Sequence, residues 1–532
     1  MAKEHLWWQT GVVYQIYPRS FQDTSGNGVG DLRGILSRLD YLHWLGVTAI
    51  WISPCFRSPM KDFGYDVSDY RDIDPLFGTL ADMDDVIAAA HERGMRIILD
   101  FVPNHTSDQH PWFIESRSSR DNPKRDWYIW RDARPDGSPP NNWLANFGGI
   151  GWQWDEHTSQ FYYHAFLTEQ PDLNWRNPEV REAMFGVLRF WLDRGVDGFR
   201  VDVLYHLIKD EQLRDNPENP KWEEGENPYR RLKAVYSSDQ DEVHEVVREM
   251  RRVFDSYDER VLIGETYVPL RRLVKYYGEN NDGAHMPFNF QLLLLEWRAD
   301  RIGEFIDRYE GALPEGAWPN WVLGNHDYPR VAWRIGAAQA RIAAMLLLTL
   351  RGTPTLYYGD ELGMADIEIP PDKVVDPPAS TLGVGRDGER TPMQWDASPN
   401  AGFTSAEEPW LPLAPDYADQ NAAVQREDPR SMLTLHQRLI QLRQSEDALT
   451  AGSYGRMHAA DDILAYSRRH NGNGFAVILN LGGKPQVVEL DPADSGRIAL
   501  STHLDREGDE VSSRIDLRPD EGVIIRLGQQ LA

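Results

Sequence analysis

Three acidic residues stand at or just beyond the ends of short apolar runs that lie far apart in the sequence. Asp202 ends the run Gly198-Phe-Arg-Val-Asp, Glu265 ends Val261-Leu-Ile-Gly-Glu, and Asp327 follows a third run by a few residues. Hydrolysis of a glycosidic bond needs one carboxylate as nucleophile or base and a second carboxyl group, with a raised pKa, as proton donor. His and Arg side chains lie near these acids, without a cysteine or histidine cluster for a metal. The residue types therefore fit glycoside hydrolysis.

Arg200 lies two residues before Asp202 in the same run. Alternate residues of a strand point to the same face, so the Arg200 guanidinium is expected beside the Asp202 carboxylate, where it keeps that carboxylate ionised. In retaining glycosidases the two carboxyl groups lie about 5–5.5 Å apart, a spacing that neighbouring strands of a barrel can provide. This arrangement suits a nucleophile at Asp202.

Strands and helices that could position these acids alternate along most of the chain. Apolar, β-branched runs predict eight strands, and stretches with apolar residues at helical spacing predict the helices between them, with single helices expected over 31–45, 80–93, 178–193 and 331–350. Such alternation is typical of a parallel sheet buried on both faces, and eight strands close a barrel. The expected strands begin at Val12, Thr48, Arg96, Gly198, Val261, His285, Trp321 and Pro354.

Polar residues gather at the C-terminal ends of these strands. The third strand ends at Asp100 and continues to His105, the fourth and fifth carry Asp202 and Glu265, and the seventh continues to Asp327. In a (β/α)₈ barrel the C-terminal ends meet on one face, which is the usual location of the active site. Each acid alone could be a helix cap or a surface ion pair, but four of them on one face favour an active site.

The alternation is interrupted twice and then ends, which predicts the domain organisation. Residues 105–175 are rich in Trp, Asn, Pro and Gly, and they are expected to form a subdomain inserted after strand three, between the barrel segments 1–104 and 176–449. A second excursion, 364–421, follows strand eight. Residues 450–532 contain short alternating strands and are expected to form a C-terminal antiparallel β-sandwich. The predicted fold class is α/β, a TIM barrel with an insert and a β domain.

Composition and net charge limit the classes of partner that the chain can be expected to bind. The 532 residues are 41% hydrophobic and 26% charged, and 56 Lys and Arg against 83 Asp and Glu give a net charge of −27. Such an acidic surface repels phosphate backbones and anionic membranes, so nucleic acid and lipid are poor candidates. The single cysteine, Cys55, excludes an intrachain disulfide and a thiolate metal cluster. Oligomeric state is left open.

The sequence contains no stretch that we interpret as a targeting or membrane segment. The first residues, Met1-Ala-Lys-Glu-His-Leu-Trp-Trp, lack the apolar stretch and cleavage site of a signal peptide. The apolar segment 337–350 is interrupted by Gln339 and Arg341, and it is too short to cross a bilayer. We therefore expect a cytoplasmic protein.

Several segments together resemble one protein family. Asp100-Phe-Val-Pro-Asn-His, Gly198-Phe-Arg-Val-Asp, Gly264-Glu and Val322-Leu-Gly-Asn-His-Asp resemble, in order, the four signature segments of the α-amylase superfamily. Gln170-Pro-Asp-Leu-Asn is similar to a fifth segment in the form typical of the α-glucosidase and oligo-1,6-glucosidase branch. Further segments of that branch are matched by Gly64-Tyr-Asp-Val-Ser-Asp-Tyr and Gly385-Arg-Asp-Gly-Glu-Arg-Thr-Pro-Met-Gln-Trp. The resemblance covers essentially the whole chain.

The resemblance implies a role for each matched residue. Asp202 would be the nucleophile, Glu265 the acid/base, and Asp327 a third acid that holds the ring hydroxyls and favours the distorted transition state. The substrate would be a short α-glucoside, cleaved from its non-reducing end without a catalytic cofactor. The residues implied to contact or support it are Asp62, Tyr65, His105, Phe166, Arg200, His326 and Arg386, with Arg390 as an alternative to Arg386 and Asp100 as a supporting residue.

The residues after the nucleophile leave bond preference open. They read Val203-Leu-Tyr-His, where many members of the resembled family have an Asn two or three places on. Val directly after the nucleophile is associated in this branch with α-1,6 bonds, and Thr with α-1,4 bonds. The resemblance is also compatible with a sucrose isomerase, a trehalose synthase or another transglucosylase. A non-catalytic binding or transporter subunit is a further alternative, although such a chain would be expected to lose the three acids.

One further segment resembles a cation-binding loop. Asp23-Thr-Ser-Gly-Asn-Gly-Val-Gly-Asp31 places oxygen ligands at alternating positions, as in the first part of an EF-hand, but Gly34 replaces the bidentate Glu of the twelfth position. Relatives of the resembled branch often hold Ca²⁺ or Mg²⁺ here. The resemblance implies a structural cation bound by Asp23, Ser25, Asn27, the carbonyl of Val29, and Asp31. The other interpretation is a turn that ends in Asp31 as a helix N-cap.

Overall fold

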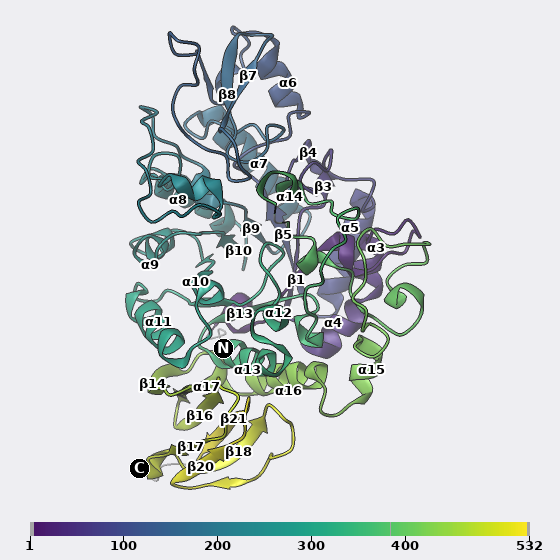
Figure 1. Ribbon diagram of the computed structural model, residues 1–532, viewed down its shortest axis with the longest axis vertical. Helices are drawn as coiled ribbons and strands as arrows, with labels where there is room; N and C mark the ends of the chain where they lie inside the picture. Colours follow the sequence, from purple (N-terminus) through teal and green to yellow (C-terminus); the bar gives the residue numbers. More distant parts are fainter. Residues whose placement is uncertain (1–4, 384, 529–532) are drawn as a thin grey trace.

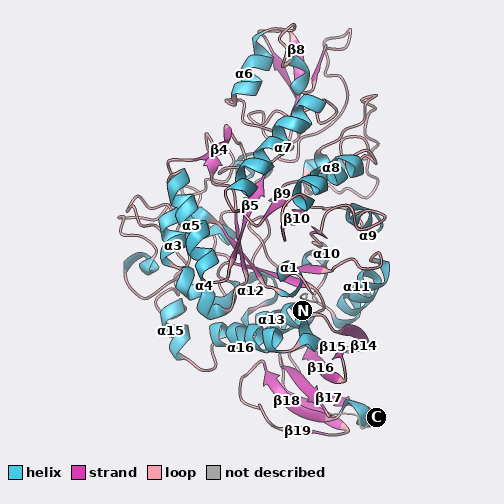
Figure 2. Cartoon of the chain, turned by 180° about the vertical axis from the view of Figure 1, so that it is seen from behind, coloured by secondary structure: helices cyan, strands magenta, loops and turns pink. Residues whose placement is uncertain are grey.

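The computed structural model describes residues 5–383 and 385–528, and its centre is one sheet of eight parallel strands (Figures 1 and 2). The order of the strands in the sheet is β11-β10-β9-β5-β2-β1-β13-β12. The eight strands predicted from the apolar runs are therefore confirmed. Their bounds are β1 Val13–Ile16, β2 Ala49–Ile52, β5 Arg96–Phe101, β9 Gly198–Val201, β10 Val261–Gly264, β11 Met286–Pro287, β12 Asn320–Val322 and β13 Thr353–Tyr357.

A side chain joins the two ends of this sheet and nearly closes the barrel. In the described residues, β11 and β12 form no ladder with each other, unlike the other neighbouring strands. Asn320 in β12 instead donates from Nδ2 to the carbonyl of Pro287 in β11 at 2.6 Å, and its Oδ1 accepts from the N–H of Asn289 at 3.0 Å. One amide side chain thus takes the place of the missing backbone bonds.

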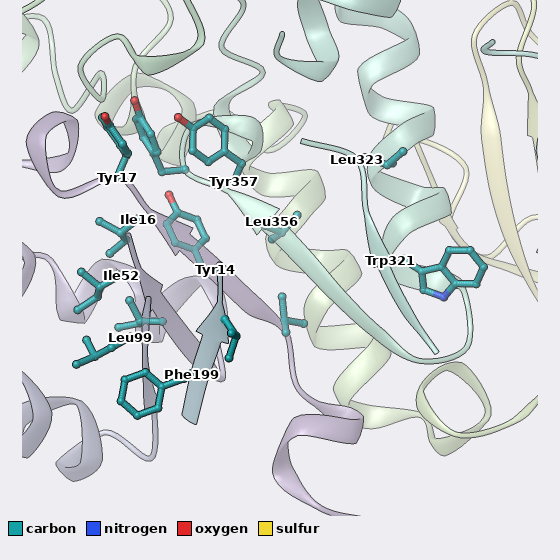
Figure 3. Packing of buried hydrophobic residues seen from close by; sticks show 14 of the residues in the cluster. Tyr14, Ile16, Tyr17, Ile52, Leu99, Phe199, Trp321, Leu323, Leu356 and Tyr357 are labelled. Carbon is teal, nitrogen blue, oxygen red and sulfur yellow. The ribbon is translucent and has the colours of Figure 1, made fainter. Parts of the chain in front are cut away.

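The strands are buried on both faces, and alternate residues belong to different hydrophobic clusters. Tyr14, Ile52 and Leu99 pack in the large cluster between the sheet and its helices, which Figure 3 shows in part. Trp51 and Ile98 belong instead to a second cluster on the other face, inside the barrel. This alternation decides where the polar residues go, because any residue two places from an inner residue also points inward.

Helices cover the outside of the barrel, and two of them differ from the prediction. The helix expected over 31–45 is divided at Arg38 into α3 and α4, and the helix expected over 331–350 is divided at Gly336, whose φ of 83° and ψ of 155° no helix accommodates. A further helix, α11, was not predicted from the sequence. The main helices are α3 Leu32–Ser37, α4 Leu39–Leu45, α5 Leu80–Glu92, α7 Pro178–Asp193, α8 Val243–Asp255, α11 Ala299–Ala312, α12 Val331–Ile335, α13 Ala337–Thr349 and α16 Met432–Ser445.

The chain between β5 and α7 projects from the barrel (Figure 1). It contains helix α6, Pro111–Ser118, and a three-stranded antiparallel sheet of β6 Trp130–Arg131, β8 Gln160–Tyr163 and β7 Trp152–Asp155. Four aromatic side chains form its small core. This projection is where an insert was predicted, and the exact domain boundaries stay a prediction. The core aromatics are Trp143, Trp152, Phe161 and Tyr163.

The C-terminal part forms antiparallel sheets, as predicted. A six-stranded sheet has the order β14-β15-β16-β21-β18-β19, and β17 pairs with β20. Buried Arg468 of β15 joins this part to the barrel, because it donates to the carbonyls of Thr349 in α13 and Leu449. The strands are β14 Ser453–Ala460, β15 Ile463–His470, β16 Asn473–Asn480, β17 Gln486–Glu489, β18 Gly496–Ser501, β19 Glu510–Val511, β20 Arg514–Leu517 and β21 Gly522–Leu527. Over the described part of the chain, no helix has the length and apolarity needed to span a membrane.

Candidate active site

The inner face of the barrel brings the predicted acids together around one arginine. Asp100 follows inner Ile98 by two residues, and Glu265 follows inner Ile263 by two, so both point into the barrel. Arg200 and Asp202 extend from β9, between the strands of those two acids. The four side chains therefore meet at the C-terminal end of three adjacent strands, as the strand alternation predicted.

Arg200 contacts all three carboxyl groups. Its Nη1 lies 2.9 Å from Oδ1 of Asp100 and 2.7 Å from Oδ1 of Asp202, and its Nη2 lies 2.8 Å from Oε1 of Glu265. Only 1% of the Arg200 side chain is exposed. Asp202 and Glu265 are thus neighbours on one guanidinium in one site, which is the arrangement that the two-carboxylate mechanism requires.

Burial and nearby charges shift the pKa of both carboxyl groups of this pair. Burial raises the pKa of Asp202 and the pKa of Glu265, and it is the largest influence on each. The Arg200 charge opposes this by lowering both pKa values, while the charge of Glu265 raises the pKa of Asp202 further. A raised pKa is what the proton donor of a retaining glycosidase needs, since that carboxyl group must keep its proton until it donates.

The residue directly after Asp202 has an unusual backbone. Val203 has φ 36° and ψ 45°, in the left-handed region that β-branched residues rarely occupy. Such strain costs about 1–3 kcal/mol. The Val203 N–H donates to Oε2 of Glu265 at 2.7 Å. This contact was not predicted from the sequence, because no residue pattern indicates a left-handed valine.

A second charged group adjoins the first and contains the third acid. Arg386 donates from Nη1 to Oδ1 of Asp327 at 2.9 Å and from Nη2 to Oδ1 of Asp62 at 3.0 Å. Burial would raise the pKa of Asp327, but the guanidinium groups of Arg386 and Arg390 hold it well below its usual range. Asp327 is therefore ionised.

Asp376 anchors the two arginines of this group, and the sequence analysis missed it. Arg386 donates to Oδ1 of Asp376 at 2.8 Å, and Arg390 donates to the same atom at 3.3 Å. Arg390 also reaches Asp327, at 3.1 Å, but no contact joins it to Asp62 in the described structure. Arg386 is thus the residue that links Asp62 to Asp327, and its predicted role in binding the sugar stays a prediction. Asp376 lies in the excursion after β13, where no strand or motif marked it.

Aromatic and histidine side chains complete the wall of the site. Gln15 of β1 donates from Nε2 to Nδ1 of His326 at 2.8 Å, so the His326 proton resides on Nε2, which lies 2.7 Å from the Tyr65 hydroxyl. The Tyr65 hydroxyl in turn lies 3.2 Å from Oδ2 of Asp100. The Tyr65 and His326 rings are parallel, with centroids 5.4 Å apart. This chain of bonds ties the wall to the acid at the barrel centre.

His105 and Phe166 come from the beginning and the end of the projecting segment. Nε2 of His105 lies 3.0 Å from the Tyr65 carbonyl, and the ring centroids of His105 and Phe166 are 5.2 Å apart. Burial lowers the pKa of His105 to about 4 and the pKa of His326 to about 3, so both rings are neutral hydrogen-bonding groups near pH 7. Gln170, which sequence analysis placed only in a motif, donates to Asp62 at 3.2 Å. The structure therefore collects all ten predicted catalytic and substrate residues in one site.

The predicted cation ligands form a separate loop before α3. Asp23 accepts bonds from the N–H groups of Gly26 and Gly28 and from the Thr404 hydroxyl, and Asp31 accepts from the N–H groups of Thr24 and Gly34. All four carboxylate oxygens accept donors from the protein in this way. A cation would need the same oxygens, so the residues as arranged do not fit one. The Gly34 bond makes Asp31 the N-cap of α3, which was the alternative interpretation.

Comparison with known proteins agrees with this geometry. The sequence matches the family described as "Alpha amylase, catalytic domain" over residues 15–452. A probable alpha-glucosidase of Rhizobium meliloti is 44% identical over 502 residues, which are 91% of this chain and 91% of that protein. Both comparisons extend well beyond the short motifs that suggested the resemblance.

Two solved structures are also similar over nearly the whole chain. The alpha-glucosyl transfer enzyme XgtA superposes with a TM-score of 0.93 at 41% identity, covering 99% of this chain and 100% of that one. The trehalulose synthase MutB from Pseudomonas mesoacidophila MX-45 superposes with a TM-score of 0.90 at 35% identity, covering 99% and 100%. A glucosidase, a glucosyl-transfer enzyme and a trehalulose synthase thus resemble this chain to similar degrees.

Proposed function

The chain belongs to the α-amylase family, and on that basis we propose that it is a retaining, exo-acting α-glucosidase. It releases glucose from the non-reducing ends of short α-glucosides with α-1,4 or α-1,6 bonds. One observation carries the proposal: the carboxyl groups of Asp202 and Glu265 contact the same buried guanidinium, Arg200, at the C-terminal face of the barrel. A nucleophile and a proton donor side by side are what the double-displacement reaction requires.

The reaction uses these two carboxyl groups and water, and it needs no cofactor. Asp202 attacks the anomeric carbon while Glu265 gives its proton to the leaving glycosidic oxygen, and a covalent glucosyl-enzyme forms. Glu265, now ionised, takes a proton from water, which attacks the anomeric carbon and releases Asp202. Arg200 stabilises the charge on Asp202 before attack and after release, since Nη1 lies 2.7 Å from its Oδ1.

The other wall residues bind the glucose ring. Ionised Asp327 accepts bonds from ring hydroxyls and favours the distorted, positively charged transition state. His105 and His326, both neutral, are hydrogen-bonding groups for further hydroxyls, and the Tyr65 ring provides a flat surface beneath the sugar. Phe166 lines the pocket beside His105. These roles follow the family motifs, and the contacts of the site support them.

The proposal includes a pocket that is closed at the end that would hold the non-reducing sugar. Asp62 and Arg386 form an ion pair there, and the Arg386 guanidinium lies 5.0 Å from the centroid of the Phe147 ring. The Thr381 hydroxyl donates to the carbonyl of Phe147 at 2.5 Å. Segments inserted after β5 and after β13 therefore meet at this pocket, which supports exo-action on short substrates.

Asp62→Asn is expected to lower kcat/KM for maltose by about 100-fold, because the buried negative charge that pairs with Arg386 and would bind a sugar hydroxyl is lost. Maltotetraose should be affected to the same degree, since its non-reducing end occupies the same pocket. The matched control is Asp69→Asn, an exposed residue of the same segment, which should keep wild-type kinetics. Unchanged kcat/KM in Asp62→Asn, or rapid cleavage inside long starch chains by the wild type, would refute the closed pocket.

Product analysis separates the proposed hydrolase from its closest alternatives. The similarity to XgtA and to MutB supports glucosyl transfer or sucrose isomerisation as a second candidate, since a sugar instead of water can accept the glucosyl group from Asp202. Rates and products are measured with maltose, isomaltose, sucrose and trehalose. Free glucose as the main product supports hydrolysis, and disaccharide isomers support the alternative. Complete inactivity of folded protein would favour a non-catalytic subunit.

Chelation is expected to leave the loop from Asp23 to Asp31 intact, because its carboxylates already accept donors from the protein. Dialysis against EDTA, followed by Ca²⁺ or Mg²⁺ at millimolar concentration, should shift Tm by less than about 1 °C. Asp23→Ala should lower Tm equally with and without the cation. A Tm that rises with cation concentration, or metal retained stoichiometrically after dialysis, would restore the structural cation.

The cytoplasmic location stays a prediction.

A further inference from the structure

The turn that follows the proposed nucleophile is strained, and Val203 within it is buried. Val203 has a φ of 36° although its side chain is β-branched, and only 7% of the residue is exposed. Left-handed backbone at such a residue persists only where its surroundings impose it. The surroundings of Val203 must therefore hold it in this conformation.

Leu204 and Gly264 provide the constraint. Leu204 is completely buried, and a Cβ placed on Gly264 would lie 2.5 Å from its Cδ2 atom. The missing side chain of Gly264 therefore leaves the space that Leu204 fills, and the turn packs against β10 one residue before Glu265. The His206 N–H closes the turn by donating to the Val203 carbonyl at 2.7 Å.

The turn ends the β9–β10 ladder at Glu265. The last backbone bond of that ladder runs from the Glu265 N–H to the Val201 carbonyl at 2.9 Å. At Val203 the chain turns away, and its N–H donates to Oε2 of Glu265 at 2.7 Å instead of to a main-chain carbonyl. Arg200 holds the other oxygen, Oε1, at 2.8 Å. Oε2 thus accepts a hydrogen bond from the Val203 N–H, while Oε1 forms an ion pair with Arg200.

We infer that the left-handed turn at Val203 is a positioning element that aims a backbone N–H at Glu265 and fixes the orientation of its carboxyl group for proton transfer. The inference rests on the proposed role of Glu265 as acid/base. Val203 acts through Glu265 and does not itself take part in the bond changes. The strain at Val203 is accordingly tied to a function that a main-chain atom performs, whichever side chain stands at the position.

The predicted signature is a change in pH dependence. The Val203 N–H bonds the ionised form of Glu265 and thereby lowers its pKa, against the larger effect of burial. Without this bond the pKa of Glu265 rises, so the protonated acid persists to higher pH. An enzyme without this N–H keeps all the other charged and titratable groups around Glu265. These groups are Asp100, Arg200, Asp202, Tyr205, Tyr267, Asp327 and Tyr328.

The direct test replaces the Val203 amide by an ester through incorporation of α-hydroxyisovaleric acid, which removes the N–H and keeps the side chain. We expect the basic limb of the kcat/KM profile for maltose to move up by about one pH unit and kcat to fall about tenfold. The control is the same ester at Val374, an exposed residue whose N–H makes no hydrogen bond within residues 5–383 and 385–528. An unchanged basic limb at Val203 would overturn the inference.

Ordinary substitutions give a second test if the ester variant does not fold. Gly264→Ala should press on Leu204, displace the turn and move the basic limb in the same direction. Leu204→Ala should move it in that direction too, because the side chain whose packing holds the turn is removed. A basic limb that stays at its wild-type position in both variants contradicts the inference. If the wild-type protein hydrolyses no α-glucoside, the proposed function fails first. If the wild type is active and these profiles stay unchanged, only the inference fails.

Discussion

Asp202→Asn is expected to lower kcat for maltose by about 10⁴-fold or more, with little change in fold. The amide nitrogen is not a nucleophile, so the covalent intermediate cannot form. The amide oxygen can still accept the bond from Arg200 Nη1 that Oδ1 of Asp202 accepts now, at 2.7 Å. Turnover is measured with maltose and with p-nitrophenyl α-glucoside, and both should fall to a similar extent because both need the same attack.

The matched control is Asp197→Asn, the same substitution at the other end of the same strand. Asp197 is completely buried and accepts bonds from His91 at 2.6 Å and from Arg96 and Arg260 at 3.2 Å each, at the face opposite the site. This variant should lower Tm, since three basic groups lose their carboxylate, and leave kcat near the wild-type value. Near-wild-type turnover in Asp202→Asn would remove Asp202 from the reaction.

Much of the site could be predicted because strand geometry converts sequence position into direction. Arg200 and Asp202 are two residues apart, and alternate residues share a face, so their contact follows from the strand alone. That Asp100, Asp202 and Glu265 meet follows from the parallel order of β5, β9 and β10. Regular elements carry such rules, and the motifs at their C-terminal ends then identify the family.

The irregular segments followed no such rule. Asp376 anchors Arg386 and Arg390 from an excursion without strands, and only the folded chain brings these three residues together. Gln15 sets the proton position of His326 across the barrel, over a sequence separation of 311 residues. The left-handed backbone of Val203 is opposed by its own side chain, and it arises from the packing of Leu204 on Gly264. Tertiary contacts override local preference at each of these places.

The loop from Asp23 to Asp31 is a second place where contacts distant in sequence decide the structure. The spacing of oxygen ligands from Asp23 to Asp31 is compatible both with an ion and with a turn that bonds itself. The difference lies in whether the carboxylate oxygens have other donors, and one of these donors, Thr404, comes from the excursion after β13, 381 residues away. Ligand spacing within one segment therefore could not distinguish the two.

Glu265→Gln is expected to separate the acid/base from the nucleophile. With maltose, kcat should fall by about 10²–10⁴-fold, the usual contribution of general acid–base catalysis, because the leaving sugar needs a proton. With α-glucosyl fluoride the leaving group needs much less assistance, so the first step should stay fast. The second step still needs a base to activate water. A glucosyl group should therefore accumulate on Asp202, where mass spectrometry of the quenched enzyme detects it.

Azide provides the decisive comparison, because it is an anionic nucleophile that needs no base. In Glu265→Gln it should restore turnover of α-glucosyl fluoride and give α-glucosyl azide with retained configuration. In Asp202→Asn the acceptor chemistry is irrelevant, since no glucosyl-enzyme forms, and azide should not yield the retained product. The amide side chain introduced by Glu265→Gln must also place its NH₂ group against one of two donors, Arg200 Nη2 or the Val203 N–H, so the Tm of this variant is the control for misplacement. Failure of azide to rescue a well-folded Glu265→Gln enzyme would assign the base to another residue.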